Sequence, residues 1–550
     1  MIYGTVGVPL GGLGRRMNEH SRAFFWVIFV ILLFLAWTNR FIQDDAFISF
    51  RYAQNLVNGH GLVFNPGEAV EGYTNFLWTL IIAIPLYFDK DVIVSSYLIS
   101  MGIFAIGLGG VYRLADLMLE NKTEALLALL LVGTNYTFSA YATGGLETTL
   151  VMALIVWAFA LSIEVIRSEN WSLGKLLLIS LLSGLALLTR LDAAIFLFAV
   201  AMILGLSWVT NGAGATNKIA QAFAITIPAL LLVGGWFIWK LDFYGDILPN
   251  TYYAKAARDG LKPELHLRGV HFIYLYLARY ALWPLLAIFF WQTMKRRPAL
   301  SQTALSVVLV LWFAYIIWTG GDFMEFRFMV VATPLIMIMA VTAMRSLPKL
   351  HFPLIAILLG VSALHGGTFA RTGGIESIDE LHQHVTGPPN NWIKVGQSMK
   401  THFGDLETPP VVALGAAGAM PYYSELEVID LLGLVDKWVA HHGETYVNRP
   451  GHMRVGNHSY AIERGTNFWV GQISGIKRLD DGSIPCRLSN YKDYFQFVGA
   501  VEDVLPDDLS FIALPVDEQW VFPILYIHPT LQIDDAIKSH GLTLCPIERS

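Results

Sequence analysis

The chain has 550 residues, of which 55% are hydrophobic and 15% are charged, and its net charge is -6. Its mean hydropathy of +0.51 is too high for a soluble globular protein and is typical of a polytopic membrane protein. The negative net charge excludes a globally basic nucleic-acid-binding protein. The two cysteines, Cys486 and Cys545, both lie in the polar C-terminal part, where a disulfide and two free buried thiols both remain open.

The first element in chain order is a glycine-rich stretch, residues 1–22, that contains Arg15, Arg16 and Arg22 and is predicted to be a cytosolic tail. No small-residue cleavage site precedes the polar loop that follows, so the apolar run between them is interpreted as a retained anchor. Because a spanning helix needs ~20 apolar residues, the sequence predicts eleven transmembrane helices, at residues 23–38, 92–112, 125–142, 147–166, 172–188, 191–209, 219–240, 270–291, 302–319, 328–346 and 353–370.

The charge of the connectors predicts the topology, since basic loops mark the cytosolic side. The clearest basic connectors are 295–297 and the pair Arg345 and Lys349. They fall on one side only if the shorter apolar run 76–88, which contains Pro85, does not cross, so we predict an interfacial or re-entrant segment there. The acidic connectors then share the opposite, external face: 44–45, 145–147, 190–192, 245–246 and 320–327.

This convergence predicts a single external active site, because charged groups at membrane depth are costly and usually functional. The alternative is that acidic residues simply collect in external loops. Residues 23–370 are therefore predicted to form a transmembrane domain whose first external loop, 39–91, is catalytic. Residues 371–550 are predicted to form an extracytoplasmic α/β soluble domain, with strand-like runs at 411–414, 467–473 and 520–528.

The motifs that the sequence contains and lacks limit the reactions that the protein could catalyse. The sequence has no Walker loop, H-E-x-x-H or G-x-S-x-G motif, and the glycine turn after 411–414 lacks the G-x-G-x-x-G pattern of dinucleotide sites. Carboxylates, arginines, amides and aromatic residues remain, and these suit glycosyl transfer. A carboxylate can deprotonate an acceptor hydroxyl or stabilise an oxocarbenium-like centre, and basic side chains can hold a phosphate leaving group.

The best catalytic candidates are Asp44 and Asp45, which open the first external loop. Adjacent residues at a helix end point about 100° apart, so one is expected to face the reaction while the other orients its surroundings; capping of the helix 46–57 is the alternative. The candidates for binding the donor phosphate are Arg51, Lys255 and Arg327. The candidates for binding the sugar or the acceptor are Glu147, Arg190, Asp192, Asn250, Tyr252, Asp322, Glu325 and Tyr422. For Arg190 with Asp192 a structural ion pair is an equal alternative, and Tyr252 with Lys255 also fits an ordinary membrane interface.

Seven segments in order, 44–68, 71–79, 143–150, 188–193, 245–255, 320–328 and 416–443, resemble the GT-C membrane glycosyltransferases. The closest likeness is to the AftB family of terminal β-(1→2) arabinofuranosyltransferases, over residues 40–460. The resemblance implies a GT-C fold, a catalytic carboxylate in the first external loop, and a decaprenyl-phosphoryl arabinofuranose donor that arrives through the membrane.

We therefore expect an enzyme of the bacterial inner membrane that transfers a sugar, D-arabinofuranose by resemblance, from a polyprenyl phosphate to an envelope glycan. No cofactor is expected to be required, while a divalent metal, the stereochemical outcome and the oligomeric state remain open. A pilin or lipopolysaccharide acceptor is the alternative within the same chemistry. A transporter or flippase of lipid-linked sugars and an envelope assembly subunit are the alternatives from other classes; the first predicts inverted repeats, which the sequence does not contain.

Overall fold

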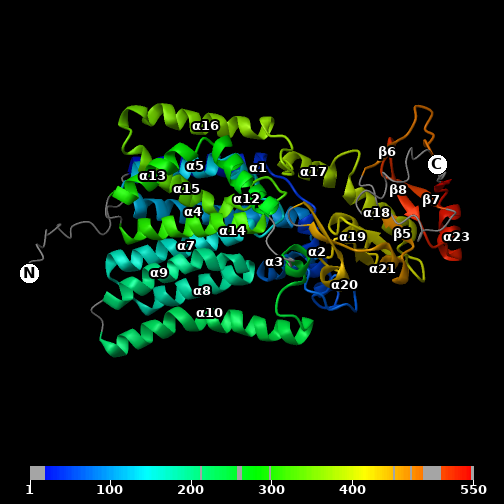
Figure 1. Cartoon of the computed structure of the whole chain (residues 1–550), viewed down its shortest axis with the longest axis horizontal. Helices are drawn as coiled ribbons and strands as arrows, with labels where there is room; N and C mark the ends of the chain where they lie inside the picture. Colours follow the sequence, from blue (N-terminus) through cyan, green and yellow to red (C-terminus); the bar gives the residue numbers. More distant parts are fainter. Residues whose placement is uncertain are drawn as a thin grey trace, which may run out of the picture.

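The computed structural model describes residues 19–210, 214–256, 263–295, 299–449, 452–470, 474–486 and 509–546. The molecule is elongated, with a bundle of helices at one end and an α/β domain at the other (Figure 1). The bundle contains residues up to the end of α16 at Thr368, and the α/β domain follows. This is the polytopic membrane protein with a C-terminal α/β domain that the sequence predicts.

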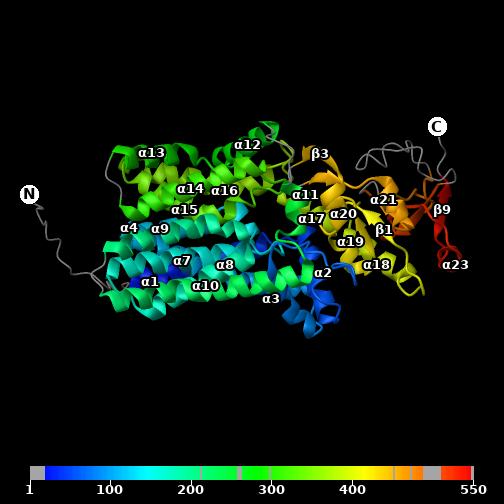
Figure 2. The same ribbon diagram turned by 60° about the horizontal axis from the view of Figure 1, so that its bottom comes forward.

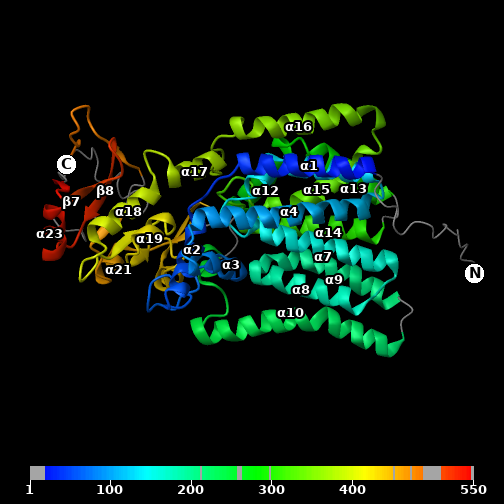
Figure 3. The same cartoon turned by 180° about the vertical axis from the view of Figure 1, so that it is seen from behind.

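Seven helices of the described residues are long and apolar enough to cross a membrane. They are α1 (Glu19–Thr38), α4 (Val92–Leu119), α7 (Thr148–Ser168), α9 (Ala194–Thr210), α10 (Ala215–Tyr244), α14 (Leu300–Thr319) and α16 (His351–Thr368). Helices α16 and α10 lie at opposite edges of the bundle (Figures 1 and 3). Since α10 is covered mainly by α8 (Leu173–Thr189), most of its apolar surface faces outward, as expected for a helix in lipid.

The number of full spans differs from the expected eleven. The segment expected at 270–291 is a pair, α12 (Pro263–Arg279) and α13 (Trp283–Lys295), bent by 101° and counting as an eighth span when taken together. The helix stops there because Ala281 has a φ of 52° and Leu282 N–H bonds back to Leu277 O, which is the geometry of a helix C-terminus. Helices α8 and α15 (Met329–Met344) are shorter apolar helices of the bundle.

The segment expected at 125–142 is also broken, into α5 (Lys122–Thr134) and α6 (Tyr136–Ala140). Asn135 leaves the helical conformation with a ψ of 119°, and its side chain accepts the Phe138 N–H. An asparagine side chain competes with the backbone for such bonds and favours helix caps over helix interiors. Hydropathy could not reveal this break, because the residues on both sides are apolar.

The short apolar run after the first loop forms α3 (Phe76–Tyr87), at the end of the bundle that faces the α/β domain (Figure 3). Twelve helical residues extend ~18 Å, which is too short for a ~30 Å hydrocarbon core. Helix α2 (Asp45–Val57) packs against it. Both helices lie within the predicted first external loop, residues 39–91.

The C-terminal domain is built on a mixed sheet with the order β2-β1-β5-β8-β7-β9, with β6 also paired to β8. Strand β1 is parallel to β2 and β5, and the other pairs are antiparallel. The strands are β1 (Val412–Leu414), β2 (Val428–Asp430), β5 (Phe468–Val470), β6 (Ile476–Lys477), β7 (Ser510–Pro515), β8 (Trp520–Tyr526) and β9 (Thr543–Pro546), with a separate hairpin of β3 (Glu444–Arg449) and β4 (His452–Val455). The strand runs predicted at 411–414 and 520–528 are β1 and β8. The run at 467–473 is β5 as far as Val470, and 471–473 lie outside the described residues.

Helices cover this sheet and connect it to the bundle: α17 (Ile378–Thr386), α18 (Trp392–Phe403), α19 (Ala419–Ser424), α20 (Lys437–His442), α21 (His458–Glu463) and α23 (Leu531–Ser539). A disulfide joins Cys486 to Cys545. Helix α11 (Asn250–Ala256) lies between the bundle and α20 (Figure 2). The predicted tail falls mostly on residues 1–18, outside the described residues, as do Arg296 and Arg297 of the basic connector.

Candidate functional site

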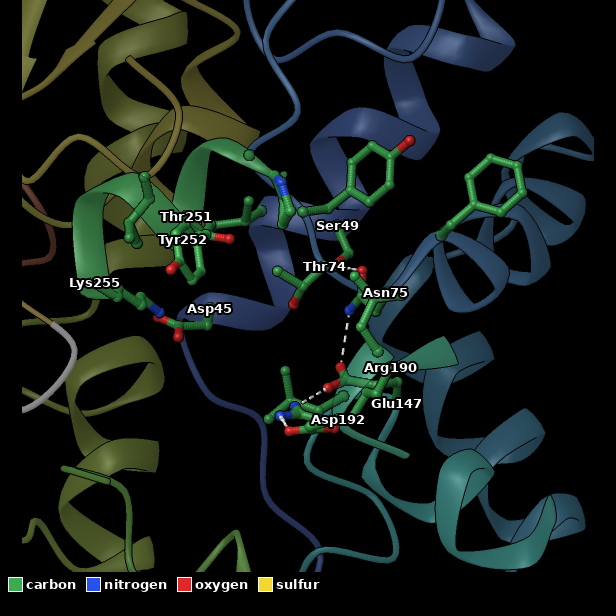
Figure 4. Close-up of a pocket in the computed structure, with 18 of the residues that line it drawn as sticks. Asp45, Ser49, Thr74, Asn75, Glu147, Arg190, Asp192, Thr251, Tyr252 and Lys255 are labelled. Atoms are coloured by element: carbon green, nitrogen blue, oxygen red, sulfur yellow. Dashed lines mark hydrogen bonds and ion pairs between the residues drawn. The ribbon is translucent and has the colours of Figure 1, made fainter. Parts of the chain in front are cut away.

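A cavity of about 470 Å³ lies where the bundle meets the C-terminal domain. Its size is within the range of small-ligand sites. The polar part of its lining comes from the beginning of α2, the segment before α3, the beginning of α7, the α8–α9 turn and α11, whose residues are labelled in Figure 4. The loop before α15 also contributes polar residues. The structure therefore brings together, in one cavity, residues from all five acidic connectors or the elements next to them.

Eight of the thirteen predicted site residues line this cavity: Asp45, Glu147, Arg190, Asp192, Tyr252, Lys255, Asp322 and Arg327. Five do not: Asp44, Arg51, Asn250, Glu325 and Tyr422.

The adjacent carboxylates Asp44 and Asp45 face different parts of the molecule. Asp45, the first residue of α2, lines the cavity. The Asp44 Oδ1 atom instead accepts the Ala419 N–H of the C-terminal domain at 2.8 Å. Burial, the largest effect, raises the pKa of Asp44 to about 7. Of the two carboxylates, only Asp45 lines the cavity.

Lys255 of α11 also lines the cavity, and its side chain points toward Asp45 (Figure 4). Burial lowers the pKa of its ammonium, and the charge of Asp45 partly opposes that shift. Tyr252, one helical turn earlier, also lines the cavity and is 39% exposed. The cavity therefore has a cation and a carboxylate on the same side.

The facing wall is a chain of charged hydrogen bonds. Arg190 donates to both carboxylate oxygens of Asp192 and, at 2.7 Å, to Glu147 Oε1. The Asn75 amide donates to Glu147 Oε2 at 2.8 Å and accepts from the Ser49 hydroxyl at 3.0 Å. Burial alone would raise the pKa of Glu147, but Arg190, Arg327 and Asn75 hold it below its usual range. The ion-pair interpretation of Arg190 and Asp192 is thus correct, and the pair also lines the cavity.

The loop before α15 contributes Asp322 and Arg327 to the same wall. Arg327 Nε donates to Asp322 Oδ2 at 2.7 Å. Burial disfavours the charged Arg327 guanidinium, but Asp322 outweighs it and raises the arginine pKa. The glycines that open this loop, Gly320 and Gly321, have φ of 86° and 81°, a region that other residues rarely adopt. A tight turn therefore opens this loop, and both charged residues line the cavity.

The apolar part of the lining comes mainly from the helices of the bundle. It includes Phe76, Leu187, Leu188, Leu191, Trp236 and Trp318. Leu191 and Trp318 are 43% and 44% exposed. A polar wall and an apolar wall in one cavity suit an amphipathic ligand.

Four of the other five predicted residues, all except Glu325, hold the first external loop and α11 against the C-terminal domain. We call this contact, formed by Asp44, Arg51, Asn65, Asn250 and the backbone of 418–436, the docking seam. Arg51 is 3% exposed, and its guanidinium donates to Phe64 O, Pro421 O and Leu426 O. Arg51 therefore does not line the cavity, and its guanidinium is already bonded to three backbone carbonyls and to Asn65 Oδ1.

Three further predicted residues also have partners elsewhere in the protein. The Asn250 amide donates to Gly433 O, Leu434 O and Asp436 O. Tyr422 is buried against Phe47 and Phe50 of α2. Glu325 is 1% exposed and turns away from the cavity toward α16 and α17. None of these three residues lines the cavity.

Two charged residues were missed. Glu71 lines the cavity, and its carboxylate forms a buried ion pair with Lys240 of α10. Burial, partly opposed by Lys240, raises the pKa of Glu71 to about 6. The sequence signal that could have revealed this pair is Lys240, a lysine at the end of an otherwise apolar span. A charged residue is rare in such a position unless it is paired. Among the described residues, no three histidine, cysteine or carboxylate side chains are grouped so that they could hold a metal ion.

Comparison with solved structures identifies the fold as that of the GT-C membrane glycosyltransferases. ArnT from Cupriavidus metallidurans in the apo state superposes with a TM-score of 0.54 and 12% sequence identity, over 92% of this chain and 98% of that one. The same protein bound to undecaprenyl phosphate gives a TM-score of 0.54 with 11% identity over the same shares.

Comparison with curated proteins confirms the likeness predicted from the sequence. The chain is 25% identical over 423 residues to a terminal β-(1→2)-arabinofuranosyltransferase of Corynebacterium glutamicum, covering 70% of this chain and 59% of the relative. It is 26% identical over 343 residues to the protein of that name from Mycobacterium tuberculosis, covering 56% and 52%. The chain thus spans little more than half the length of these relatives. A domain of unknown function, DUF8728, matches residues 378–498.

Proposed function

We propose that this protein is a glycosyltransferase that moves a sugar, D-arabinofuranose, from a polyprenyl phosphate to a cell-envelope glycan outside the bacterial inner membrane. The observation that carries the proposal is the cavity at the end of the bundle next to the C-terminal domain, where the Asp45 carboxylate faces Lys255 beside an apolar wall. The GT-C fold and the similarity to arabinofuranosyltransferases support the reaction class and the sugar.

Lys255 and Arg327 are the proposed ligands of the donor phosphate. Both line the cavity, and Arg327 gives only its Nε hydrogen to Asp322. Its terminal amino groups make no other hydrogen bond to the described residues and suit a phosphate, which arginine recognises through two donors. The undecaprenyl phosphate bound by the structural relative supports a lipid-phosphate ligand.

The apolar wall is the proposed path of the prenyl chain. Leu191 and Trp318 are partly exposed at the surface of the bundle, next to the cavity. A chain held there remains in contact with lipid while its phosphate lies among charged side chains. The sugar, attached to that phosphate, then lies against the wall of Glu147, Arg190 and Asp192, whose carboxylate oxygens can accept hydrogen bonds from hydroxyl groups.

In the proposed step, an acceptor hydroxyl oxygen forms a bond to the anomeric carbon of the sugar while the bond from that carbon to the phosphate oxygen breaks. The proton of the hydroxyl goes to Asp45. The polyprenyl phosphate leaves with the electron pair of the broken bond, and Lys255 and Arg327 stabilise its charge. No redox change and no nucleotide are needed.

The proposed orientation places the C-terminal domain outside the cytosol. Two observations support it: the acidic loops meet at the end of the bundle next to that domain, and the two cysteines form a disulfide. Disulfides persist in oxidising compartments. A membrane-impermeant maleimide should therefore label Cys486, which is only partly buried, on intact spheroplasts after reduction. Absence of labelling until the membrane is opened would contradict this orientation.

The direct test uses the purified full chain in nanodiscs with synthetic polyprenyl-phosphoryl arabinofuranose and separate envelope glycan, pilin and lipopolysaccharide acceptors. We expect a pentose added to the glycan and free polyprenyl phosphate, both detected by mass spectrometry. A product with another acceptor would correct the acceptor alone. No transfer from any donor would contradict the enzyme, and movement of the intact donor between leaflets of proteoliposomes would then identify a flippase.

A further inference from the structure

Glu325 and His365 form a buried pair that the proposed reaction does not use. His365 Nε2 lies 2.9 Å from Glu325 Oε1, and the two side chains are 2% and 1% exposed. The second oxygen, Glu325 Oε2, accepts the Ile378 N–H at the start of α17. One carboxylate therefore links α16, the loop 320–327 and the C-terminal domain.

The side chains of the loop 320–327 point in two directions. Asp322, Phe323 and Arg327 line the cavity. Met324, Glu325 and Phe326 turn to the other side, where all three are essentially buried. A backbone bridge fixes this second side, because Glu325 N–H donates to Glu376 O and Glu376 N–H donates to Phe323 O. The placement of the cavity residues thus depends on how the buried side is held.

The turn that returns the chain to the cavity is strained. Phe326 has a φ of 46°, a left-handed conformation that non-glycine residues avoid. Such strain persists only where the surroundings over-determine the conformation. Here the Phe326 ring packs against Phe272, Tyr276 and Phe369. Glu325, the residue before it, is tied at both oxygens.

His365 is itself held in place on both faces. Its ring stacks on Tyr280 with centroids 4.7 Å apart and on Phe369 with centroids 5.2 Å apart. An aromatic ring fixed in this way presents its nitrogen in one direction only, so it restricts the position of Glu325.

From this geometry we infer that Glu325 and His365 are positioning residues: they hold the loop 320–327 so that Asp322 and Arg327 face the donor. The role of the loop in binding the donor rests on the proposed function. The contacts that hold the loop in place are given by the structure. Neither side chain touches the cavity, so each acts only through the loop.

The test compares three variants of the full chain in nanodiscs. His365→Phe keeps the aromatic stacking and loses the bond to Glu325. Glu325→Gln keeps an oxygen for the Ile378 N–H and an amide for the ring. Ser362→Ala is the matched control: Ser362 lies one turn earlier on α16, donates to Thr134 O and accepts the Tyr136 N–H. The control therefore removes two bonds of the same helix without touching the loop.

Two readouts are needed, namely hydrogen exchange of the peptide 320–327 and steady-state transfer kinetics. We expect His365→Phe to accelerate exchange in that peptide and to lower kcat/KM for the donor about 10- to 100-fold, since small misplacements of binding groups have effects of that size. Glu325→Gln should retain most of the activity. Ser362→Ala should lower the melting temperature while leaving both readouts unchanged. If His365→Phe does not fold, His365→Leu replaces it with the same expectation, because leucine also lacks a group that can hydrogen-bond to Glu325.

Unchanged exchange of 320–327 in His365→Phe would overturn the inference, as would faster exchange with unchanged kinetics. An equal loss in Ser362→Ala would also overturn it, because the effect would then be a general loss of stability. A wild-type chain that transfers no sugar would instead overturn the proposed function, and the exchange comparison would still decide whether the pair holds the loop.

Discussion

The cavity and the docking seam contain the same kinds of residue, but the polar side chains of the two regions have different partners. In the docking seam, the polar atoms of Arg51 and Asn250 are bonded to backbone carbonyls of the C-terminal domain. In the cavity, Asp45, Lys255 and Arg327 present charge to an open volume. A polar side chain near a site is therefore a candidate ligand only when its hydrogen bonds are not already used by the backbone.

The adjacent pair Asp44 and Asp45 offers the sharpest test of this comparison. We expect Asp45→Asn to lower turnover about 100- to 10,000-fold, the usual contribution of a general base. Asp44→Asn should stay close to wild type at neutral pH, because an amide oxygen can still accept the Ala419 N–H. Transfer assays with both variants, checked for equal melting temperature, measure this. If only Asp44→Asn lost turnover, Asp44 at the docking seam, and not Asp45, would be the reacting carboxylate.

Arg51 tests the seam from the other direction. Arg51→Ala leaves three buried carbonyl groups without their donor, and we expect the free energy of unfolding to fall by about 2–4 kcal/mol. Thermal unfolding and limited proteolysis of the junction between the bundle and the C-terminal domain measure the loss. The KM for the donor should not change in the molecules that remain folded. A raised KM with normal stability would restore the phosphate contact predicted for Arg51.

Lys255 is the matching cation on the cavity side. We expect Lys255→Met to raise the donor KM about 10- to 100-fold, the effect of losing a hydrogen bond to a charged group. Lys437→Met is the control, since Lys437 forms only a partly exposed ion pair with Asp246, at 2.7 Å, and such pairs contribute little. Binding of polyprenyl phosphate to the two variants, measured directly, distinguishes a ligand contact from a general change of charge. Equal affinities would remove Lys255 from the site.

The smallest expected effect is a pH dependence of the seam. The raised pKa of Asp44, about 7 against an ordinary value of 3.8, means that the folded protein holds this proton more tightly than the unfolded chain does. Its favourable contribution is complete below about pH 4 and is lost as the pH rises through about 7. The melting temperature of Asp44→Asn relative to wild type should therefore increase between pH 5 and pH 8. A difference that stays constant over this range would show that Asp44 is not buried at the seam.

Much of the fold could be predicted because hydropathy and charge are local properties of the sequence. Apolar runs, basic connectors and the change in composition near residue 370 predict a membrane bundle with a polar C-terminal domain. The breaks at Asn135 and Ala281 could not be predicted, because one side-chain cap or one left-handed residue stops a helix without changing its apolar character. The acidic connectors 145–147, 190–192 and 320–327 were predicted to lie on the same face of the molecule. Charged residues from all three line the cavity.

The sequence by itself determined which residues carry charge at the end of the bundle and that these charges share one side of the membrane. Only the tertiary structure decided which of them face a cavity. The reason is that a carboxylate or guanidinium binds whichever donor or acceptor the fold brings to it, and those partners come from far along the chain. Asp44 is hydrogen-bonded to Ala419, Arg51 to Pro421 and Leu426, and Glu325 to His365. Asp45, one residue from Asp44, lies on the other side of the helix start and faces Lys255.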